Sequence, residues 1–331
     1  MCPLSPPKPH QSYPDLVALL EGRGMVIPDK SRAERKLSQI GYYRLSGFWY
    51  PCREIKKDQA GQYVIDPNTN IPVRADSFQP NTNFDDIIEL YLFDKKLRQL
   101  ILDAIERIEI HVRSVIAHEM GYHDPLAYQD QSYINPRQCA TWTDRRRGTT
   151  RNIWNEWQVR QNNQLDRSRE DCILWHKTNG KAIPFWVAVE AWDFGIMSKY
   201  YEILKGSYQN RICSRLGINN PRTLKSWLQE INTLRNRCAH HARIWNQSFP
   251  SPLPVANDQY FVNLALSRDA LERMYGMICV LWFLVNKIGP SSQWLECVAD
   301  QVDSKPSIDC CPNTAMGFPD NTGFPRGQFG L

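Results

Sequence analysis

Apolar residues recur at steps of three and four along most of the chain, the spacing that places side chains on one face of an α-helix. The longest such stretch begins at Phe84, after a capping segment at Asn81–Asn83, and continues to about Met120. We therefore predict one long helix that turns an apolar stripe toward the core. The stripe consists of Leu97, Ile101, Ala104, Ile108, Val112 and Val115.

The N-terminal region predicts two short helices. The first opens with a proline and closes on a glycine, and the second is capped by Asp29 or Ser31 and ends at Gly41. The aromatic segment Tyr42–Arg53 is expected to form a strand or a turn-rich structure. Residues 54–79 are polar and contain prolines, so we expect a loop or a small hairpin.

Three further apolar helices are predicted in the second half of the chain. One begins at Pro184, a second at Pro221 after two asparagines, and a third at Ser267 or Asp269. The Gly- and Pro-rich tail is expected to be irregular. Because the helical period dominates throughout, we predict an all-α fold class.

These patterns divide the chain into three parts. Residues 1–80 hold the short helices and the aromatic and loop segment, residues 81–300 form a helical domain, and residues 301–331 form the tail. A Trp- and Arg-rich insertion at about residues 122–180 is expected to form at least one exposed helix. Its cations can contact RNA phosphates or form a solvated basic loop. They are Arg145, Arg146, Arg147 and Arg151.

The composition is that of an ordinary folded protein. Hydrophobic residues make up 42% and charged residues 23% of the 331 positions, so the chain as a whole is not expected to be disordered. The formal net charge of +5 is a mild basic excess that permits an anionic partner without requiring one.

Several features predict a cytoplasmic protein without membrane association. Ten cysteines are scattered without the spacing of a disulfide framework, so we expect reduced thiols. The N-terminal residues are prolines and polar residues where a signal peptide would need an apolar run. The most apolar segment, Met277–Val285, is far shorter than the roughly 20 residues of a membrane span. We expect it to be a buried helix.

The helix predicted from Pro221 carries a dense polar motif, "LRNRCAHHARIWN", at Leu234–Asn246. Continued through this motif at about 100° per residue, the helix places Asn236 and His240 opposite its apolar stripe and His241 on the border of that stripe. Asn232 lies on the same polar arc as Asn236. The inward stripe consists of Leu224, Leu228, Ile231, Leu234, Cys238, Ala242 and Trp245, with Trp227 beside it.

The polar arc combines groups that are suited to RNA cleavage. Asn236 precedes His240 by four residues, so its amide can hydrogen-bond the imidazole and determine the tautomer. Arg235 and Arg243 flank the imidazole and can hold a phosphate through bidentate guanidinium groups. An imidazole that titrates near neutral pH beside a phosphate can transfer protons while the ribose 2′-OH attacks.

Simpler explanations of the motif stay open. A polar arc is by default the solvent-facing side of an amphipathic helix. The Arg-x4-His spacing is weakly specific, since Arg113 and His118 form a second instance. A metal site is not expected, because His240 and His241 would point about 100° apart and no Cys-x2-Cys pattern lies nearby. We predict neither a metal nor a cofactor.

Four long blocks of the sequence resemble one known family. They are "YYRLSGFWYP", "FDDIIELYLFDKKLRQLILDAIERIEIHVRS", "IPFWVAVEAWDFGIMSKYYEIL" and "SWLQEINTLRNRCAHHARIWN". In this order they are similar to the Abi-like proteins of bacterial abortive-infection phage defence, of the AbiD/AbiF type. That family is related to the HEPN superfamily of all-helical RNases, so the resemblance implies a HEPN-like helical bundle.

The resemblance also implies site residues and an oligomeric state. Arg235, Asn236 and His240 carry over as the phosphate-binding group, the histidine orienter and the proton-transfer residue of a metal-independent RNase. HEPN sites are commonly assembled from two facing motifs, and this chain has one convincing motif, so we expect a homodimer. Supporting positions are His241, Arg243 and Asn246 of the same block, together with Asn232.

The expected function is therefore an antiviral endoribonuclease that cuts RNA by 2′-OH attack and leaves a 2′,3′-cyclic phosphate. Two alternatives belong to other classes of protein. One is a non-cleaving RNA-binding module that partners with a structured noncoding RNA, and the other is a protein-interaction scaffold that senses a phage component. A noncoding RNA or an antitoxin also stays open as a partner, and the sequence does not determine whether either one restrains the protein.

Overall fold

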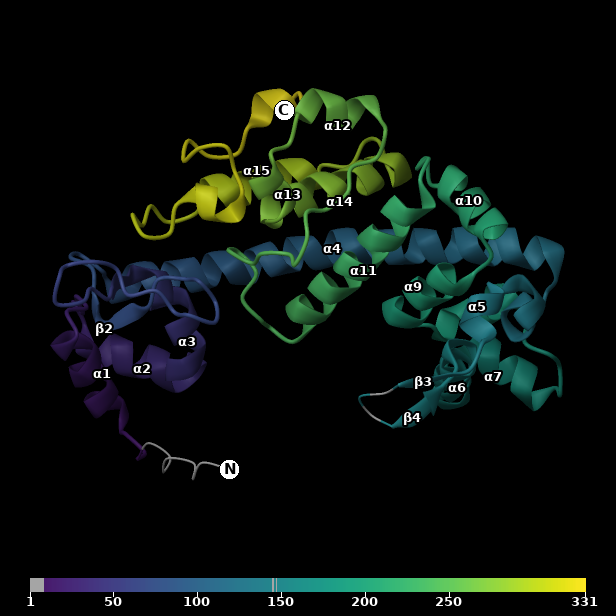
Figure 1. Ribbon diagram of the computed structural model, residues 1–331, viewed down its shortest axis with the longest axis horizontal. Helices are drawn as coiled ribbons and strands as arrows, with labels where there is room; N and C mark the ends of the chain where they lie inside the picture. The colour runs from purple at the N-terminus through teal and green to yellow at the C-terminus, as the bar shows by residue number, and fades with distance from the viewer. Residues whose placement is uncertain (1–8, 145, 147) are drawn as a thin grey trace. The chain divides into compact units, whose positions relative to one another are not determined.

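Most of the chain is α-helical in the computed structural model, which describes residues 9–144, 146 and 148–331 (Figure 1). These residues form fifteen α-helices, several short 3-10 helices and two small two-stranded sheets. The predicted all-α class is confirmed, with two short hairpins added to it.

The chain groups into two compact units, which are described separately. The first contains the chain up to Leu97 together with Asp300–Ala315 and Asp320–Phe324. The second contains Arg98–Ala299 and two short C-terminal segments. The domain boundaries predicted near residues 80 and 300 stay predictions.

Two short helices begin the first unit, as predicted. They are α1 (Tyr13–Gly22) and α2 (Lys30–Ile40). The Asp29 carboxylate caps α2 by accepting a hydrogen bond from the Arg32 amide at 2.8 Å, and the helix ends at Gly41. Local capping residues therefore determine where α2 begins and ends.

The strand or turn-rich structure expected for Tyr42–Arg53 is wrong over most of its length. Residues Tyr42–Trp49 form helix α3, and Tyr50–Cys52 continue it as a 3-10 helix. The side chains that bury one face of α3 lie at helical spacing, which was hidden among the other aromatic residues. They are Leu45, Phe48 and Trp49, each at most 2% exposed.

A hairpin and a long helix follow. Strand β1 (Arg53–Ile55) pairs antiparallel with β2 (Arg74–Phe78), which confirms the hairpin alternative for residues 54–79. Helix α4 (Phe84–His123) is the predicted long helix, and the Asn83 side chain caps it by accepting from the Asp85 amide at 2.9 Å. Five of its six stripe residues are at most 1% exposed, and Val115 is partly exposed.

The second unit contains the later part of α4, the remaining helices and a hairpin. The hairpin pairs β3 (Trp142–Asp144) with β4 (Thr149–Arg151). The helices are α5 (Pro136–Cys139), α6 (Ile153–Arg167), α7 (Asp171–Thr178), α8 (Phe185–Ala188), α9 (Phe194–Ile203), α10 (Gly206–Arg215), α11 (Pro221–Ala239), α12 (Gln259–Leu264), α13 (Arg268–Leu271), α14 (Met274–Ile288) and α15 (Trp294–Asp303), the last only to Ala299.

Two helices that were predicted as continuous are interrupted. The helix expected from Pro184 divides into α8 and α9, because Trp192 is extended and the Asp193 carboxylate caps α9 by accepting from the Ile196 amide at 2.8 Å. The helix expected from Ser267 divides into α13 and α14, because Arg273 is extended. In both cases the apolar periodicity of the sequence continues through a residue with an extended backbone, at which the helix is interrupted.

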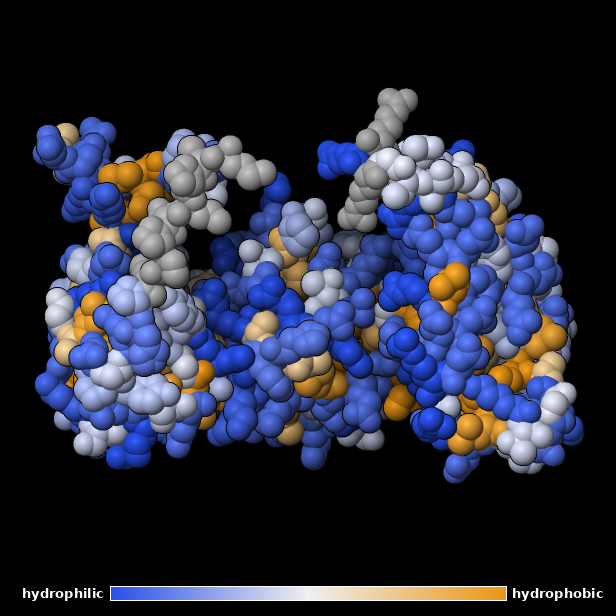
Figure 2. All heavy atoms as spheres, turned by 90° about the horizontal axis from the view of Figure 1, so that it is seen from below, coloured by the Kyte–Doolittle hydropathy of each residue, from blue (hydrophilic) through white to orange (hydrophobic). Residues whose placement is uncertain are grey.

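The most apolar segment of the chain lies in the interior, as predicted. Met277–Val285 belong to α14, and all but one of these side chains are at most 5% exposed. No helix in the described part of the chain has the length and apolar character needed to cross a membrane. The face drawn in Figure 2 is mainly hydrophilic, with separate small apolar patches.

Aromatic packing attaches the insertion to α9. The ring of Trp157, in α6, lies 4.9 Å from Tyr200 and 5.2 Å from Trp192, measured between ring centroids. Its indole nitrogen donates a hydrogen bond to the Ile196 carbonyl at 3.0 Å. The expected exposed helix is thus half-buried, with Arg160 on its solvent-facing side.

Candidate functional site

Helix α11 has one buried and one solvent-facing side. It begins at Pro221, and the Asn220 side chain caps it by accepting from the Arg222 amide at 2.9 Å. The residues expected to face inward along it are at most 2% exposed, which confirms the predicted orientation: Leu224, Trp227, Leu228, Ile231, Leu234 and Cys238.

The helix ends at Ala239, inside the polar motif. His240 is the C-cap residue, and His241 adopts a left-handed conformation with φ of 59°. The Ala242 amide donates to the Arg237 carbonyl at 2.8 Å, and the His241 amide donates to the Cys238 carbonyl at 3.0 Å. These two bonds form a Schellman motif, whose left-handed position is most often occupied by glycine.

Burial of the following residues explains why the helix stops. Ile244 and Trp245 are both fully buried after the turn, and the Ala242 carbonyl accepts a hydrogen bond from Arg98 at 3.3 Å. Burying two large apolar side chains favours the chain reversal over a further helical turn. The projected helix through Trp245 is therefore wrong. His241, expected at the border of the buried stripe, is exposed.

The three predicted catalytic residues lie at this helix terminus. Asn236 and His240 are exposed, and Arg235 is partly exposed. The Asn236 carbonyl accepts from the His240 amide at 2.9 Å, but the structure contains no bond between the Asn236 amide group and the His240 ring. The Asn236 side-chain oxygen instead accepts a long hydrogen bond of 3.5 Å from Arg235.

A partly buried carboxylate on α4 adds a group that the sequence pattern did not place at the site. Burial raises the pKa of Glu109, and the charges of Arg113 and Arg235 partly oppose this increase. Arg113 donates to Glu109 at 2.7 Å and to the Trp192 carbonyl at 2.9 Å. Since Arg113 already has these partners, its pairing with His118 as a second Arg-x4-His motif is less favoured than a structural role.

The supporting residues lie around the same terminus. The Arg243 carbonyl accepts from the Arg237 guanidinium at 3.2 Å, which holds the chain after the Schellman turn. The side-chain oxygen of Asn246 is buried and has no hydrogen-bond partner among the described residues. A buried polar atom without a partner calls for a functional or structural explanation.

A cleft of about 520 Å³ lies between α11 and the insertion. Asn232 and Thr233 of α11 line one side of it, and Trp142 and Arg160 line the other. Arg151 also lines the cleft, 5.6 Å from the centre of the Trp142 ring. The cleft begins one helical turn before Arg235 and Asn236.

The predicted RNA-contacting arginines have different environments. Arg145 and Arg147 lie outside the described residues, and Arg146 is exposed in the turn of the β3–β4 hairpin. Arg151 donates to Glu156 at 2.7 Å. Its charge is therefore partly neutralised before any phosphate contact.

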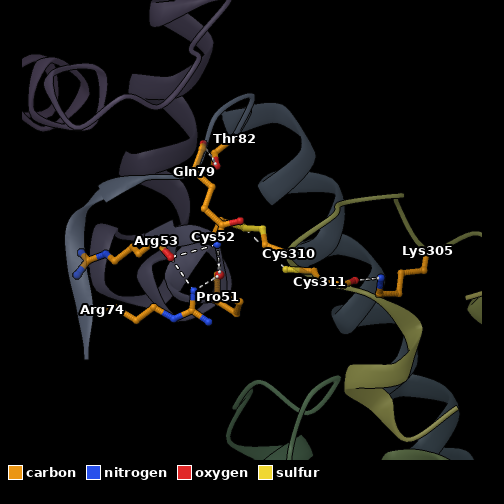
Figure 3. Close-up of a disulfide and its surroundings, with 9 residues drawn as sticks. All are labelled: Pro51, Cys52, Arg53, Arg74, Gln79, Thr82, Lys305, Cys310 and Cys311. Carbon is orange, nitrogen blue, oxygen red and sulfur yellow. Dashed lines mark hydrogen bonds between the residues drawn. A yellow bond between two sulfur atoms is a disulfide. The ribbon is translucent and has the colours of Figure 1, made fainter. Parts of the chain in front are cut away.

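The cysteines were expected to be reduced thiols, and for two of them this is wrong. Cys52 and Cys310 form a disulfide although 258 positions separate them, a proximity that no local pattern encodes (Figure 3). Within the described residues, Cys52, Cys310 and Cys311 form the group of side chains that could hold a metal ion. None of the candidate RNase residues belongs to this group.

Helical architecture and a cluster of polar residues at the end of α11 define a mostly α-helical protein with a candidate site at that helix terminus. A family model described as Abi-like protein matches residues 35–246, and the chain belongs to this family. The match covers nearly two thirds of the chain and ends at Asn246, the last residue of the polar motif. No curated protein and no solved structure matches the chain significantly.

Proposed function

We propose that this Abi-like protein acts in abortive infection as a HEPN-type endoribonuclease that needs no metal ion. The observation that carries the proposal is the placement of the Arg-x4-His motif. Arg235, Asn236 and His240 lie on the accessible terminus of α11, within the segment that the family model matches. Asn236 and His240 are exposed and Arg235 is partly exposed, so an RNA phosphate can reach all three side chains.

Each residue has a defined part in the proposed reaction. Arg235 binds the scissile phosphate, and Asn236 orients this guanidinium through the contact at 3.5 Å. His240 accepts the proton of the ribose 2′-OH as its oxygen attacks phosphorus. The bond from phosphorus to the 5′-oxygen breaks, that oxygen takes up a proton, and a 2′,3′-cyclic phosphate remains.

The cleft beside α11 supplies a path for the RNA strand. Trp142 is 44% exposed, so an unpaired base can stack on its ring. Arg160 is exposed on the same side of the cleft and can contact a phosphate. Asn232 and Thr233 then lead along α11 to Arg235 one turn later.

A turnover assay in excess EDTA tests this function. The wild-type protein is expected to cut RNA with the chelator present, and Arg235→Ala or His240→Ala to slow cutting by about 100-fold or more. Arg222→Ala, at the exposed start of α11, and His176→Ala, at a partly exposed position of α7, are matched controls that should retain the wild-type rate. Loss of cutting in EDTA, or undiminished cutting by both site variants, would contradict the proposal.

One observation favours a second function, RNA binding without cleavage. In the structure of the single chain, Arg235 interacts with Asn236 and Glu109, and no hydrogen bond links Asn236 to the His240 ring. A non-cleaving protein would use the same terminus only to hold phosphates. His240→Ala would then retain both RNA binding and phage protection, whereas Arg235→Glu would lose both.

A further inference from the structure

Three cysteine sulfurs meet in the first unit. Cys52 and Cys310 are joined by a disulfide, and the Cys311 sulfur lies 3.8 Å from the Cys52 sulfur (Figure 3). All three sulfur positions fall within 4.8 Å of one another. Cys52 is therefore adjacent to two sulfurs that come from consecutive residues.

The backbone around Cys52 is held firmly. The Cys52 carbonyl accepts from the Gln79 amide at 2.8 Å. Arg74 donates to the carbonyls on either side, to Pro51 at 2.8 Å and to Arg53 at 2.6 Å. The position of Cys52 is thus fixed by its backbone hydrogen bonds, and the sulfurs of Cys310 and Cys311 both lie near its sulfur.

The two consecutive cysteines differ in exposure. Cys310 is partly exposed, whereas Cys311 is fully buried, as is Cys52. The Lys305 ammonium donates to the Cys311 carbonyl, and the Cys311 amide donates to the Ile308 carbonyl at 2.8 Å. These bonds hold Cys311 beside the disulfide.

From this geometry we infer that Cys52, Cys310 and Cys311 form a thiol–disulfide exchange site. The Cys311 thiolate attacks the Cys52 sulfur, a bond forms between Cys311 and Cys52, and the bond between Cys52 and Cys310 breaks. Cys310 leaves as a thiolate and takes up the proton that Cys311 released, so the exchange requires no oxidant or reductant.

The exchange moves the covalent link between a partly exposed and a buried position. With Cys310 bonded, one of the linked sulfurs belongs to a residue that external thiols can approach. With Cys311 bonded, both linked sulfurs are buried, and the accessible cysteine is a thiol that can react with a small disulfide. The chain segment after α15 stays tied to Cys52 in both states, so the site regulates accessibility to thiol reagents without releasing that segment.

Disulfide mapping of the whole protein tests this inference independently of RNase activity. The protein is equilibrated in a glutathione redox buffer, quenched by alkylation, and cleaved before Asp309 and Asp320, which separates Cys310 and Cys311 from Cys297. Tandem mass spectrometry then identifies the bonded cysteine. The wild type is expected to contain both the Cys52–Cys310 and the Cys52–Cys311 species.

Two variants and a control sharpen the test. Cys310→Ser should still form a disulfide between Cys52 and Cys311, and Cys311→Ser should contain only the bond to Cys310. Cys297→Ser, at an exposed position of α15, should reproduce the wild-type mixture. Circular dichroism establishes that each variant is folded.

Two results would overturn the inference. In the first, wild-type Cys311 stays fully alkylated while Cys310→Ser remains a dithiol in the buffer that oxidises the wild type. In the second, the reduced protein holds stoichiometric Zn²⁺ through the three cysteines and forms no disulfide in the same buffer.

Discussion

His241 has a backbone conformation that is uncommon for residues other than glycine. It occupies the left-handed position of the Schellman motif with φ of 59°, where a side chain with a Cβ atom is disfavoured. Non-glycine residues in this region are concentrated at functional sites. Glycine at this position would make the fold more stable. The presence of histidine instead supports a functional role for its imidazole.

His241→Gly tests this at the residue scale. Glycine relieves the left-handed conformation, so we expect the free energy of unfolding to increase by about 0.5–1 kcal/mol, after the entropic cost of glycine is included. Urea denaturation measures the change, and His241→Ala, which retains a Cβ, should show no such gain. RNA cleavage by His241→Gly should be weaker than that of the wild type. A less stable glycine variant would refute the argument from conformation.

At the scale of elements, close packing and buried charges hold neighbouring helices together. A Cβ atom at Gly276 of α14 would lie 2.5 Å from the Ala270 carbonyl oxygen of α13. Because this neighbour is backbone, it cannot move aside as a flexible side chain would. The contact between the two helices therefore depends on a glycine at this position.

We expect Gly276→Ala to lower the free energy of unfolding by about 1–3 kcal/mol, since the added methyl group overpacks the contact between α13 and α14. Gly206→Ala is the matched control, because no heavy atom lies within 4 Å of the added Cβ at the start of α10. Thermal unfolding of both variants measures the difference. If Gly276→Ala and Gly206→Ala had equal melting temperatures, α13 and α14 would be able to accommodate the added methyl group without a loss of stability, contrary to this prediction.

A buried carboxylate connects α4 to α10. Glu119 is 2% exposed and accepts from Arg215 at 2.6 Å, and Arg211 also forms an ion pair with it. Burial alone would raise the pKa of Glu119, but the hydrogen bonds and charges of Arg215 and Arg211 outweigh it and lower the pKa below 4.5. The ionised form is therefore bound more favourably in the folded state.

Glu119→Gln should lower the free energy of unfolding by about 1–3 kcal/mol at neutral pH, because it removes a charged hydrogen-bond acceptor. A depressed folded-state pKa contributes stability above the unfolded value of 4.5, and this contribution is lost as the pH falls through the folded value. Urea denaturation of both proteins between pH 7 and pH 3 should show the difference shrinking below about pH 4.5. A difference that stays constant over this range would show that ionisation of Glu119 is not its source.

At the scale of the whole molecule, we propose that a second copy of the chain completes the RNase site. Arg235 and His240 are accessible on one helix terminus, so a twofold axis can place His240 of one copy opposite Arg235 of its partner. Within one chain Arg235 hydrogen-bonds Asn236 and its charge acts on Glu109, which is consistent with a site completed only on pairing.

Mixing two inactive variants tests this arrangement. The Arg235→Ala protein and the His240→Ala protein are mixed so that they exchange subunits, and half of the resulting dimers then contain one copy of each variant. In such a mixed dimer, one of the two sites has both an intact Arg235 and an intact His240. The mixture should therefore recover about a quarter of the wild-type activity. Each variant incubated alone is the control and should stay inactive. Absence of recovery, with subunit exchange demonstrated by native mass spectrometry, would place the site within a single chain.

Features encoded by neighbouring residues could be predicted from the sequence alone. The caps Asp29 and Asn220, the long stripe of α4 and the buried face of α11 all depend on contacts within a few positions, so their patterns are local. The family and the Arg-x4-His motif are likewise readable without a structure. The RNase reaction, the partner RNA and the dimer stay proposals.

Tertiary structure decided the features that depend on distant partners. The end of α11 at Ala239 follows from the burial of Ile244 and Trp245, and the effect of the Arg235 charge on Glu109 arises only because folding brings residues of α11 and α4 near each other. The meeting of Cys52 with Cys310 likewise needs the folded chain. Helical periodicity in the sequence does not predict such long-range contacts, because the free energy of burial depends on which surfaces meet in the folded chain.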